Sequence, residues 1–372
     1  MEPMKDVGMA VIWGLHYMDI ESQKKLTRKE KDYLIQGVDS LVKMFKDHPD
    51  SFLEDKELHP LTFWILSKPG EIWWFCHLAR IGHIIDSFRN TQGFETVEQR
   101  LRNSRFFFGA LAEIETAALL RDCGATVEFL KPTEKRTADL IIAYQDKAIY
   151  VEVTTLEPTD EEWIQYQRML RLHFSLRHEP GIDCALRANQ KLSGKRVTEY
   201  MKNIRKGIED VTSGVDPIVE YQDEFVEYII TLSEMKHIVD AWRLARGLPA
   251  NIALSYPAAQ PKTGQRIRQR LKNKSFHQMN PDKPWIFHLS LVPHVLQWAL
   301  NPVEVTRNIE DLLEDQSHLL LSIVSSWNEG TEKDIRSCEK ISNSYFKVRG
   351  ICSKRVDSIL LTPNKYSKFK DM

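Results

Sequence analysis

Apolar residues recur at helical spacing over the first hundred positions of the chain. The stripe that follows Thr27, a good helix N-cap, consists of Leu34, Val38, Leu41, Val42 and Phe45. A second apolar helix is predicted over residues 71–88. These patterns predict an N-terminal all-helical domain over residues 1–105. We interpret it as a packing or dimerisation domain, and a ligand or partner pocket is the alternative.

The pattern changes near residue 106, where helices begin to alternate with strands. The apolar stripe of residues 107–118 predicts a helix that ends before Gly124, a residue suited to the left-handed position after a helix. Apolar runs then predict strands over residues 126–130, 138–144, 148–156, 218–221, 227–232, 285–291 and 356–361, and helices over 160–178, 263–278, 304–315 and 332–345. This order indicates an α/β domain over residues 106–372.

The composition is that of an ordinary globular protein. Of its 372 residues, 51 are Lys or Arg and 52 are Asp or Glu, so the formal net charge is −1. This balance excludes a uniformly basic coat protein and a disordered acidic chain, but it allows a local basic patch. The 5 cysteines form no CxxC pair, and no apolar run reaches the ~20 residues of a membrane span. We therefore expect a cytoplasmic protein without a membrane partner.

Two carboxylates are predicted to face each other across a β-hairpin. If residues 145 and 146 form a two-residue turn, Asp139 lies opposite Glu152 in an apolar neighbourhood. Directly opposed like charges destabilise a sheet, and unpaired buried charge is costly. Oxygen ligands of this kind suit Mg²⁺ or Mn²⁺, which activate bound water and bind phosphate oxygens. The alternative is that each acid pairs with a nearby Lys or Arg.

A glutamate on the preceding helix adds to this pattern. Glu113 lies between two alanines, which allow a helix to approach a sheet closely, whereas Glu115 lies about 200° further round the helix and faces elsewhere. The order is a helix with Glu113, a first strand, segment 138–140 (Ala-Asp-Leu) and segment 150–154 (Tyr-Val-Glu-Val-Thr). It resembles the PD-(D/E)XK nuclease superfamily. The resemblance implies a restriction-endonuclease-like fold, in which helices flank a mixed sheet.

The same resemblance implies roles for individual residues. Asp139 and Glu152 correspond to metal ligands, and Glu113 to a third ligand or to a residue that orients a metal-bound water. Thr154 stands where the family has its lysine, and Ala138 where it usually has proline. A threonine hydroxyl cannot supply the positive charge of that lysine. Either another basic residue has taken over this role, or the activity is weak or lost.

The predicted helix over residues 263–278 is the best candidate source of that charge. It contains no acid, and one of its faces carries Arg266, Arg270, Lys274 and Gln278 at i, i+4 spacing, with Lys272 nearby. A Lys-x-x-x-Gln helix before an apolar strand also resembles nuclease-like proteins in which a helix residue replaces the strand lysine. That resemblance makes Lys274 and Gln278 further catalytic candidates. A solvated basic face is the alternative.

A second basic stretch covers residues 187–206. Its candidate contacts to nucleic acid are Lys191, Lys195, Arg196, Lys202 and Arg205. Two such stretches in one half of the chain indicate contacts to a phosphate backbone, and the signature of such contacts is salt-dependent binding. A solvated face is again the alternative for each stretch.

Two functions are consistent with these patterns. The first is a Mg²⁺- or Mn²⁺-dependent nuclease that hydrolyses phosphodiester bonds with metal-activated water and for which DNA is favoured over RNA. The second is a catalytically inactive nuclease-fold protein that binds nucleic acid or acts as a scaffold. For the N-terminal helices, a homodimer contact is the default expectation.

Overall fold

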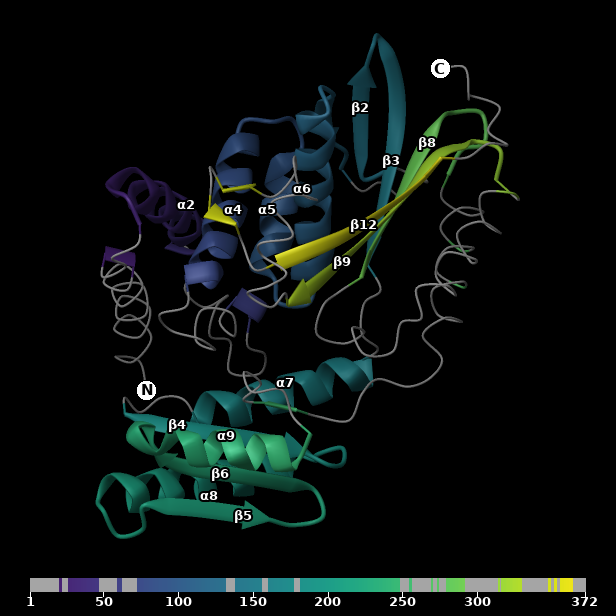
Figure 1. Ribbon diagram of the computed structural model, residues 1–372. Coiled ribbons are helices and arrows are strands. Elements are labelled where there is room, and N and C mark those ends of the chain that lie inside the picture. The colour runs from purple at the N-terminus through teal and green to yellow at the C-terminus, as the bar shows by residue number, and fades with distance from the viewer. Residues whose placement is uncertain are drawn as a thin grey trace. The chain divides into compact units, whose positions relative to one another are not determined.

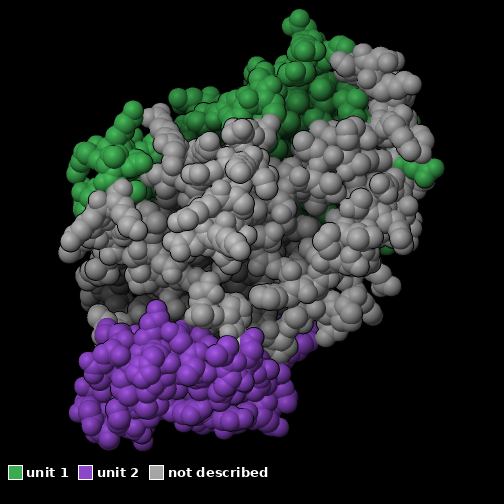
Figure 2. All heavy atoms as spheres, in the orientation of Figure 1, with its two compact units in different colours: residues 1–54, 68–157, 259–372 green, residues 55–67, 158–258 purple. Residues whose placement is uncertain are grey.

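The chain folds as an α/β protein with two compact units (Figure 2). Unit 1 comprises residues 1–54, 68–157 and 259–372, and unit 2 comprises residues 55–67 and 158–258. The computed structural model describes residues 20–21, 26–46, 59–61, 72–131, 138–155, 160–176, 181–247, 254–255, 269, 273, 279–291, 314, 316–329, 347–348, 351–352 and 355–363.

Unit 1 is built on a six-stranded mixed sheet with the strand order β1-β2-β3-β8-β9-β12 (Figure 1). Its strands are β1 (Thr126–Phe129), β2 (Leu140–Tyr144), β3 (Lys147–Thr155), β8 (Trp285–Leu291), β9 (Leu319–Glu329) and β12 (Arg355–Pro363). The first three strands form an antiparallel meander. Strand β8 is parallel to β3, β9 is parallel to β8, and β12 closes the sheet in the antiparallel direction. A separate two-stranded ribbon pairs β10 (Lys347–Val348) with β11 (Ile351–Cys352).

The helices of unit 1 pack on each other and on the meander. They are α2 (Arg28–Lys46), α4 (Ile72–Phe88), α5 (Phe94–Arg102) and α6 (Phe107–Asp122). Helix α6 contacts β1, β2 and β3, and α5 contacts both α6 and β1. The predicted cap of α2 is confirmed: the Thr27 hydroxyl accepts from the Glu30 amide at 3.3 Å, and the Glu30 carboxylate accepts from the Thr27 amide at 2.7 Å.

Helices α2 and α4 cross in backbone contact. The crossing needs glycine on both helices, because a Cβ on Gly82 would lie 1.7 Å from the carbonyl oxygen of Gly37. These N-terminal helices belong to the same unit as the sheet. The division of the structure into units therefore does not coincide with the predicted boundary between residues 105 and 106.

Unit 2 is a four-stranded sheet with the order β5-β6-β4-β7 and helices on both faces. Its elements are α7 (Asp160–Leu176), β4 (Ile182–Ala188), α8 (Gly194–Thr212), β5 (Ile218–Gln222), β6 (Val226–Leu232), the 3₁₀ turn η2 (Ser233–Met235), α9 (Lys236–Ala245) and β7 (Leu254–Ser255). Alternate residues of β4 and β6 point to opposite faces, so α7 and α8 share one core and α9 packs on the other side.

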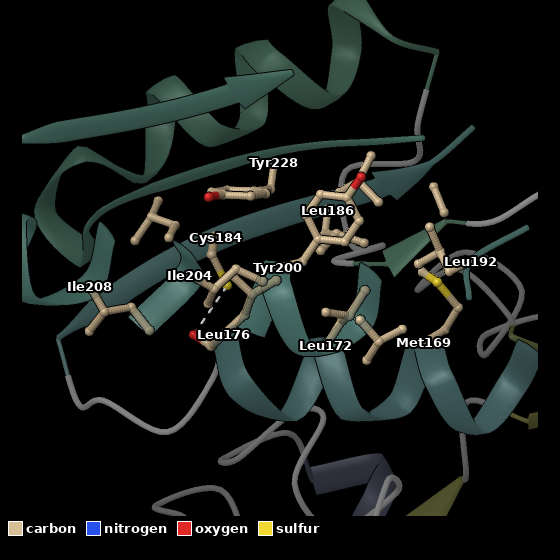
Figure 3. Packing of buried hydrophobic residues seen from close by; sticks show 14 of the residues in the cluster. Met169, Leu172, Leu176, Cys184, Leu186, Leu192, Tyr200, Ile204, Ile208 and Tyr228 are labelled. Carbon is tan, nitrogen blue, oxygen red and sulfur yellow. Dashed lines mark hydrogen bonds between the residues drawn. The ribbon is translucent and has the colours of Figure 1, made fainter. Parts of the chain in front are cut away.

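The larger core of unit 2 lies between α7, α8 and the sheet (Figure 3). Its labelled members are Met169, Leu172, Leu176, Cys184, Leu186, Leu192, Tyr200, Ile204, Ile208 and Tyr228. Helix α8 comes close to the sheet at Gly207, where a Cβ would lie 3.0 Å from the side chain of Val219. Because the apolar face of α8 is buried in this way, its opposite face is available to solvent.

Most of the predicted helices and strands are found, with shifts of a few residues at their ends. The helices at residues 71–88, 107–122 and 160–178 and the strands of the meander are confirmed. The sequence patterns did not predict α5, β4, α8, α9 or β9, nor the short strands β7, β10 and β11. The predicted helix over residues 263–278 lies outside the described residues except for positions 269 and 273, which are helical. Residues 304–315, apart from residue 314, and residues 332–345 also lie outside them.

Candidate functional site

The β2–β3 hairpin has the pairing register that the sequence predicted. Tyr144 pairs with Lys147, and the pairing continues to Leu140 opposite Val151. Both turn residues are in the left-handed region, with φ 49° at position 145 and φ 61° at position 146. Positive φ at both positions is the mark of a type I′ turn, whose twist matches that of the strands. The hairpin therefore forms although Gln-Asp is not the favoured turn sequence.

Asp139 lies where β2 begins and departs from the ladder. Its amide donates to the carbonyl of Val151 at 3.1 Å, and its carboxylate Oδ2 accepts from the amide of Val153 at 2.8 Å. In a regular continuation of β2, a main-chain carbonyl would accept from that amide. The carboxylate of Asp139 thus takes the place of a main-chain group at the end of the strand.

Glu152 lies next to Val153 on β3 and is fully buried, with 0% of its surface exposed. Two contacts establish the direction of its side chain. Val153 pairs with His288 of β8, and the ring of His288 contacts Thr116 on α6, so odd-numbered positions at this end of β3 face α6. Adjacent residues of a strand point to opposite faces. The side chain of Glu152 therefore points away from α6, toward the face that also bears Tyr150 and Thr154.

Glu113 lies on α6 and is 4% exposed. Arg100, in the last turn of α5, binds both of its carboxylate oxygens: Nη1 lies 2.6 Å from Oε1 and Nη2 lies 2.5 Å from Oε2. Burial lowers the pKa of Arg100, but the hydrogen bonds and charge of Glu113, together with the charge of Asp139, outweigh it and raise the pKa overall. The negative charges of two of the three predicted metal ligands, Glu113 and Asp139, therefore act on this guanidinium.

The second glutamate of α6 has its own arginine. Arg80 of α4 lies 3.0 Å from Glu115, and both side chains are 9% exposed. The prediction that Glu113 and Glu115 face different surroundings is confirmed, because their partners come from different helices.

The predicted group of three carboxylates does not form. Among the described residues, no three or more His, Cys, Asp or Glu side chains lie close enough to bind one metal ion. The reason is visible in the contacts of each acid. Glu113 is engaged by Arg100, Asp139 binds the Val153 amide, and Glu152 points away from the face that α6 covers. In this arrangement the three residues do not fit a shared Mg²⁺ or Mn²⁺ ion.

Thr154, at the position of the family's lysine, is 3% exposed and pairs with Leu289 on β8. Threonine carries no charge, and this side chain is buried between strands, so it cannot replace the family's lysine. The proposed replacements on the helix over residues 263–278 all lie outside the described residues: Arg266, Arg270, Lys272, Lys274 and Gln278.

The second basic stretch includes the end of β4 and the first half of α8, both in unit 2. Lys191 pairs with Glu161 at 2.6 Å. Arg196 stacks 3.5 Å above the ring of Phe225 and lies 3.8 Å from Glu224. Lys195, Lys202 and Arg205 are exposed on α8, and so is the neighbouring Lys206. Within the described part of the chain, these last four side chains make no ion pair.

Sequence reasoning missed Arg100 and His288. Arg100 follows the apolar positions Phe94 and Val97 of a nine-residue helix, which is too short to stand out by periodicity. His288 is buried, and its Nδ1 lies 2.5 Å from the Thr116 hydroxyl. Because that hydroxyl donates to the carbonyl of Ala112, it accepts from the histidine.

Comparison with known proteins adds no assignment. No model of a protein family, no curated protein and no solved structure matches the chain. Across the described residues, no helix has the length and apolar character that a membrane crossing requires.

Proposed function

We propose that this chain binds nucleic acid, with DNA favoured over RNA, through unit 2, and that the nuclease-like core of unit 1 does not cleave it. The observation that carries the proposal is the outer face of α8. Four basic side chains there, those of Lys195, Lys202, Arg205 and Lys206, are exposed and make no ion pair in the part of the chain that is described. Free cations along one helix are the usual means of contact with a phosphate backbone.

The aromatic surroundings of Arg196 extend this basic face. Its guanidinium stacks on Phe225, and Tyr200 and Tyr221 both donate hydrogen bonds to Asp223 nearby, at 2.5 Å and 3.1 Å. Burial and the contact with Asp223 raise the pKa of the Tyr200 hydroxyl, so it stays protonated and keeps this donor. The stacked arginine therefore lies in the first turn of the same helix that carries the free charges.

The core supports binding without turnover. The family's lysine position is the buried Thr154, and the carboxylate of Glu113 is held by Arg100. The resemblance to the PD-(D/E)XK superfamily is supported by the order α6, β1, β2, β3, with Asp139 at the start of β2. A nuclease-like core in which Glu113 and Asp139 are bound by groups of the protein is consistent with a binding or scaffolding role.

A metal-dependent nuclease remains the second candidate, and one observation favours it. The register of the hairpin agrees with the count that opposes Asp139 to Glu152, and the Asp139 carboxylate binds the amide of the next residue, Val153. The two acids thus lie on neighbouring strands, and an ion site there would need few protein ligands, since Mg²⁺ keeps several waters.

Binding is tested by fluorescence anisotropy with a labelled DNA duplex over a series of salt concentrations. We expect the triple variant Lys202→Ala/Arg205→Ala/Lys206→Ala to bind more weakly and to reduce the salt slope by roughly 2 to 3, since each phosphate contact contributes about 0.9. The matched control, Lys29→Ala/Lys43→Ala/Lys131→Ala, removes the same charge from exposed positions of unit 1. Equal losses in both variants, or no binding by the wild type to DNA or RNA, would contradict the proposal.

Cleavage is tested on single- and double-stranded DNA and RNA, with Mn²⁺ and with a chelator. The binding proposal expects the wild type and Asp139→Ala to leave every substrate intact. Mn²⁺-dependent cleavage that is lost in Asp139→Ala would establish the second candidate in its place.

A further inference from the structure

We propose that Arg100 is the resident cation of the carboxylate cluster in unit 1, and that its guanidinium holds the Glu113 carboxylate that a divalent metal ion would otherwise bind. This inference concerns the core of unit 1 and does not depend on nucleic-acid binding by α8. It assigns a role to a residue that the sequence pattern does not single out.

The contact between Arg100 and Glu113 has the geometry of a strong ion pair. Two nearly parallel N–H···O bonds of 2.6 Å and 2.5 Å join the guanidinium to both carboxylate oxygens. Charge-assisted bidentate bonds of this kind are short and specific, and a planar guanidinium matches a planar carboxylate. Both oxygens thus accept from Arg100, which neutralises the charge that would attract a metal ion to Glu113.

Asp139 is the second acid of the cluster, and it makes the net charge of the cluster negative. The carboxylate Oδ2 of Asp139 accepts from the Val153 amide, and the negative charge of this residue acts on the guanidinium of Arg100. Arg100, Glu113 and Asp139 together carry a charge of −1. Without the arginine the charge would be −2, from two oxygen-ligand side chains. Such a pair is the kind of site that attracts a hard divalent cation.

The arginine also excludes such an ion by repulsion. A divalent ion bound to Glu113 would lie close to a permanently charged guanidinium, because arginine does not deprotonate in proteins. The side chain of Glu113 is only 5% exposed, so water screens this repulsion poorly. A metal ion and Arg100 therefore compete for one carboxylate. Arg100 has the advantage, because it is part of the chain and cannot dissociate.

Helix α6 offers a matched comparison. Arg80 binds Glu115 on the same helix at 3.0 Å, and its side chain is more buried than that of Arg100, at 9% exposure against 26%. The charge that acts on Arg100 from Asp139 comes from the residue just before β2, whereas Arg80 belongs to the α4–α6 contact. If the proposal holds, loss of Arg100 creates affinity for a divalent ion and loss of Arg80 does not.

The experiment measures binding of Mn²⁺ alone, without nucleic acid, by electron paramagnetic resonance of free Mn²⁺ and by thermal unfolding. We expect weak Mn²⁺ binding by the wild type and by Arg80→Ala, and at least tenfold tighter binding by Arg100→Ala. Free Mn²⁺ at ten times its Kd should raise the Tm of Arg100→Ala by about 3 °C. The double variant Arg100→Ala/Asp139→Asn should lose this gain.

Three results would overturn the proposal. The first is stoichiometric Mn²⁺ binding by the wild type that disappears in Asp139→Asn, because the ion and not Arg100 would then be resident. The second is a folded Arg100→Ala that binds Mn²⁺ no better than the wild type. The third is an equal gain in Arg80→Ala. If Arg100→Ala does not fold, Arg100→Gln is used, since its amide can still donate to Glu113. These readouts are independent of the DNA-binding test, so the two proposals can fail separately.

Discussion

Helices α6 and α8 use charge in opposite ways. Helix α6 buries two glutamates, and each is bound by an arginine from another helix of unit 1. Helix α8 of unit 2 buries only its apolar face and leaves Lys195, Lys202 and Arg205 in solvent. The charges on α6 are thus part of the interior of unit 1, whereas those on α8 are part of a surface.

This difference decides what each set of charges does. A buried charge costs several kcal/mol in desolvation unless its partner is retained, so the α6 pairs matter for folding. Exposed charges contribute little to stability but steer and bind charged partners. The two helices should therefore respond differently to loss of charge.

The largest change is expected for Arg100→Met. The substitution leaves Glu113 buried at 4% exposure without the ion pair. Removing one member of a buried pair costs about 3–5 kcal/mol, and the 26% exposure of the Arg100 side chain favours the lower end, about 3 kcal/mol. The measurement is the free energy of unfolding in urea.

The double variant Arg100→Met/Glu113→Leu is the control for this prediction. Since it removes the charge as well as its partner, it should recover most of the loss. A cost below about 1 kcal/mol for Arg100→Met would mean that Glu113 is well solvated, and the contrast between α6 and α8 would then be broken.

The second change is a loss of stability in acid, caused by His288. Burial lowers the pKa of this imidazole to about 4, although the charge of Glu115 opposes the shift. In the unfolded chain the pKa of His288 returns to about 6.5. Between about pH 4 and pH 6.5, therefore, the imidazole is protonated in the unfolded state but neutral in the folded state. The stabilising contribution is complete above about pH 6.5 and is lost as the pH falls toward 4. We expect a loss of about 2 kcal/mol between pH 7 and pH 5.

A matched pair of variants isolates this contribution. His288→Gln removes the buried titrating group, whereas His237→Gln removes an exposed histidine on α9 of unit 2. The loss of folding free energy between pH 7 and pH 5 should be smaller by about 2 kcal/mol in His288→Gln and unchanged in His237→Gln. The same pH profile in both variants would exclude His288 as its cause.

The sequence predicted those parts of the fold that depend on neighbouring residues. The stripe of α2, the cap at Thr27 and the β2–β3 register follow from local periods and turn length. Strand β9 and helix α9 were missed. Helix α9 has only ten residues, and four of the last five residues of β9, Ser-Ser-Trp-Asn-Glu, are polar, which is atypical of a strand. Their identity is decided by the neighbouring strands and helices on which they pack.

The candidate site was predicted less completely than the fold, for a physical reason. The count along the hairpin correctly brought Asp139 near β3, but it could not show that this residue leaves the ladder and binds the Val153 amide. Nor could the sequence show that α5 docks on α6 with Arg100 against Glu113. Glu113 has a basic partner, Arg100, although the alternative of a pairing with Lys or Arg was raised only for Asp139 and Glu152. Such pairs arise from tertiary packing and leave no spacing in the sequence.

The smallest change in stability is expected for the α8 variant Lys202→Ala/Arg205→Ala/Lys206→Ala. Positions 202 and 206 are one helical turn apart, so like charges repel there by a few tenths of a kcal/mol, and alanine is the better helix former. We expect the free energy of unfolding to change by less than about 0.5 kcal/mol, or to rise slightly, in urea at low salt. A loss above about 1 kcal/mol would show that these side chains are partners within unit 2. Their assignment to a binding surface would then fail, because weaker DNA binding by the variant would only report damage to the fold.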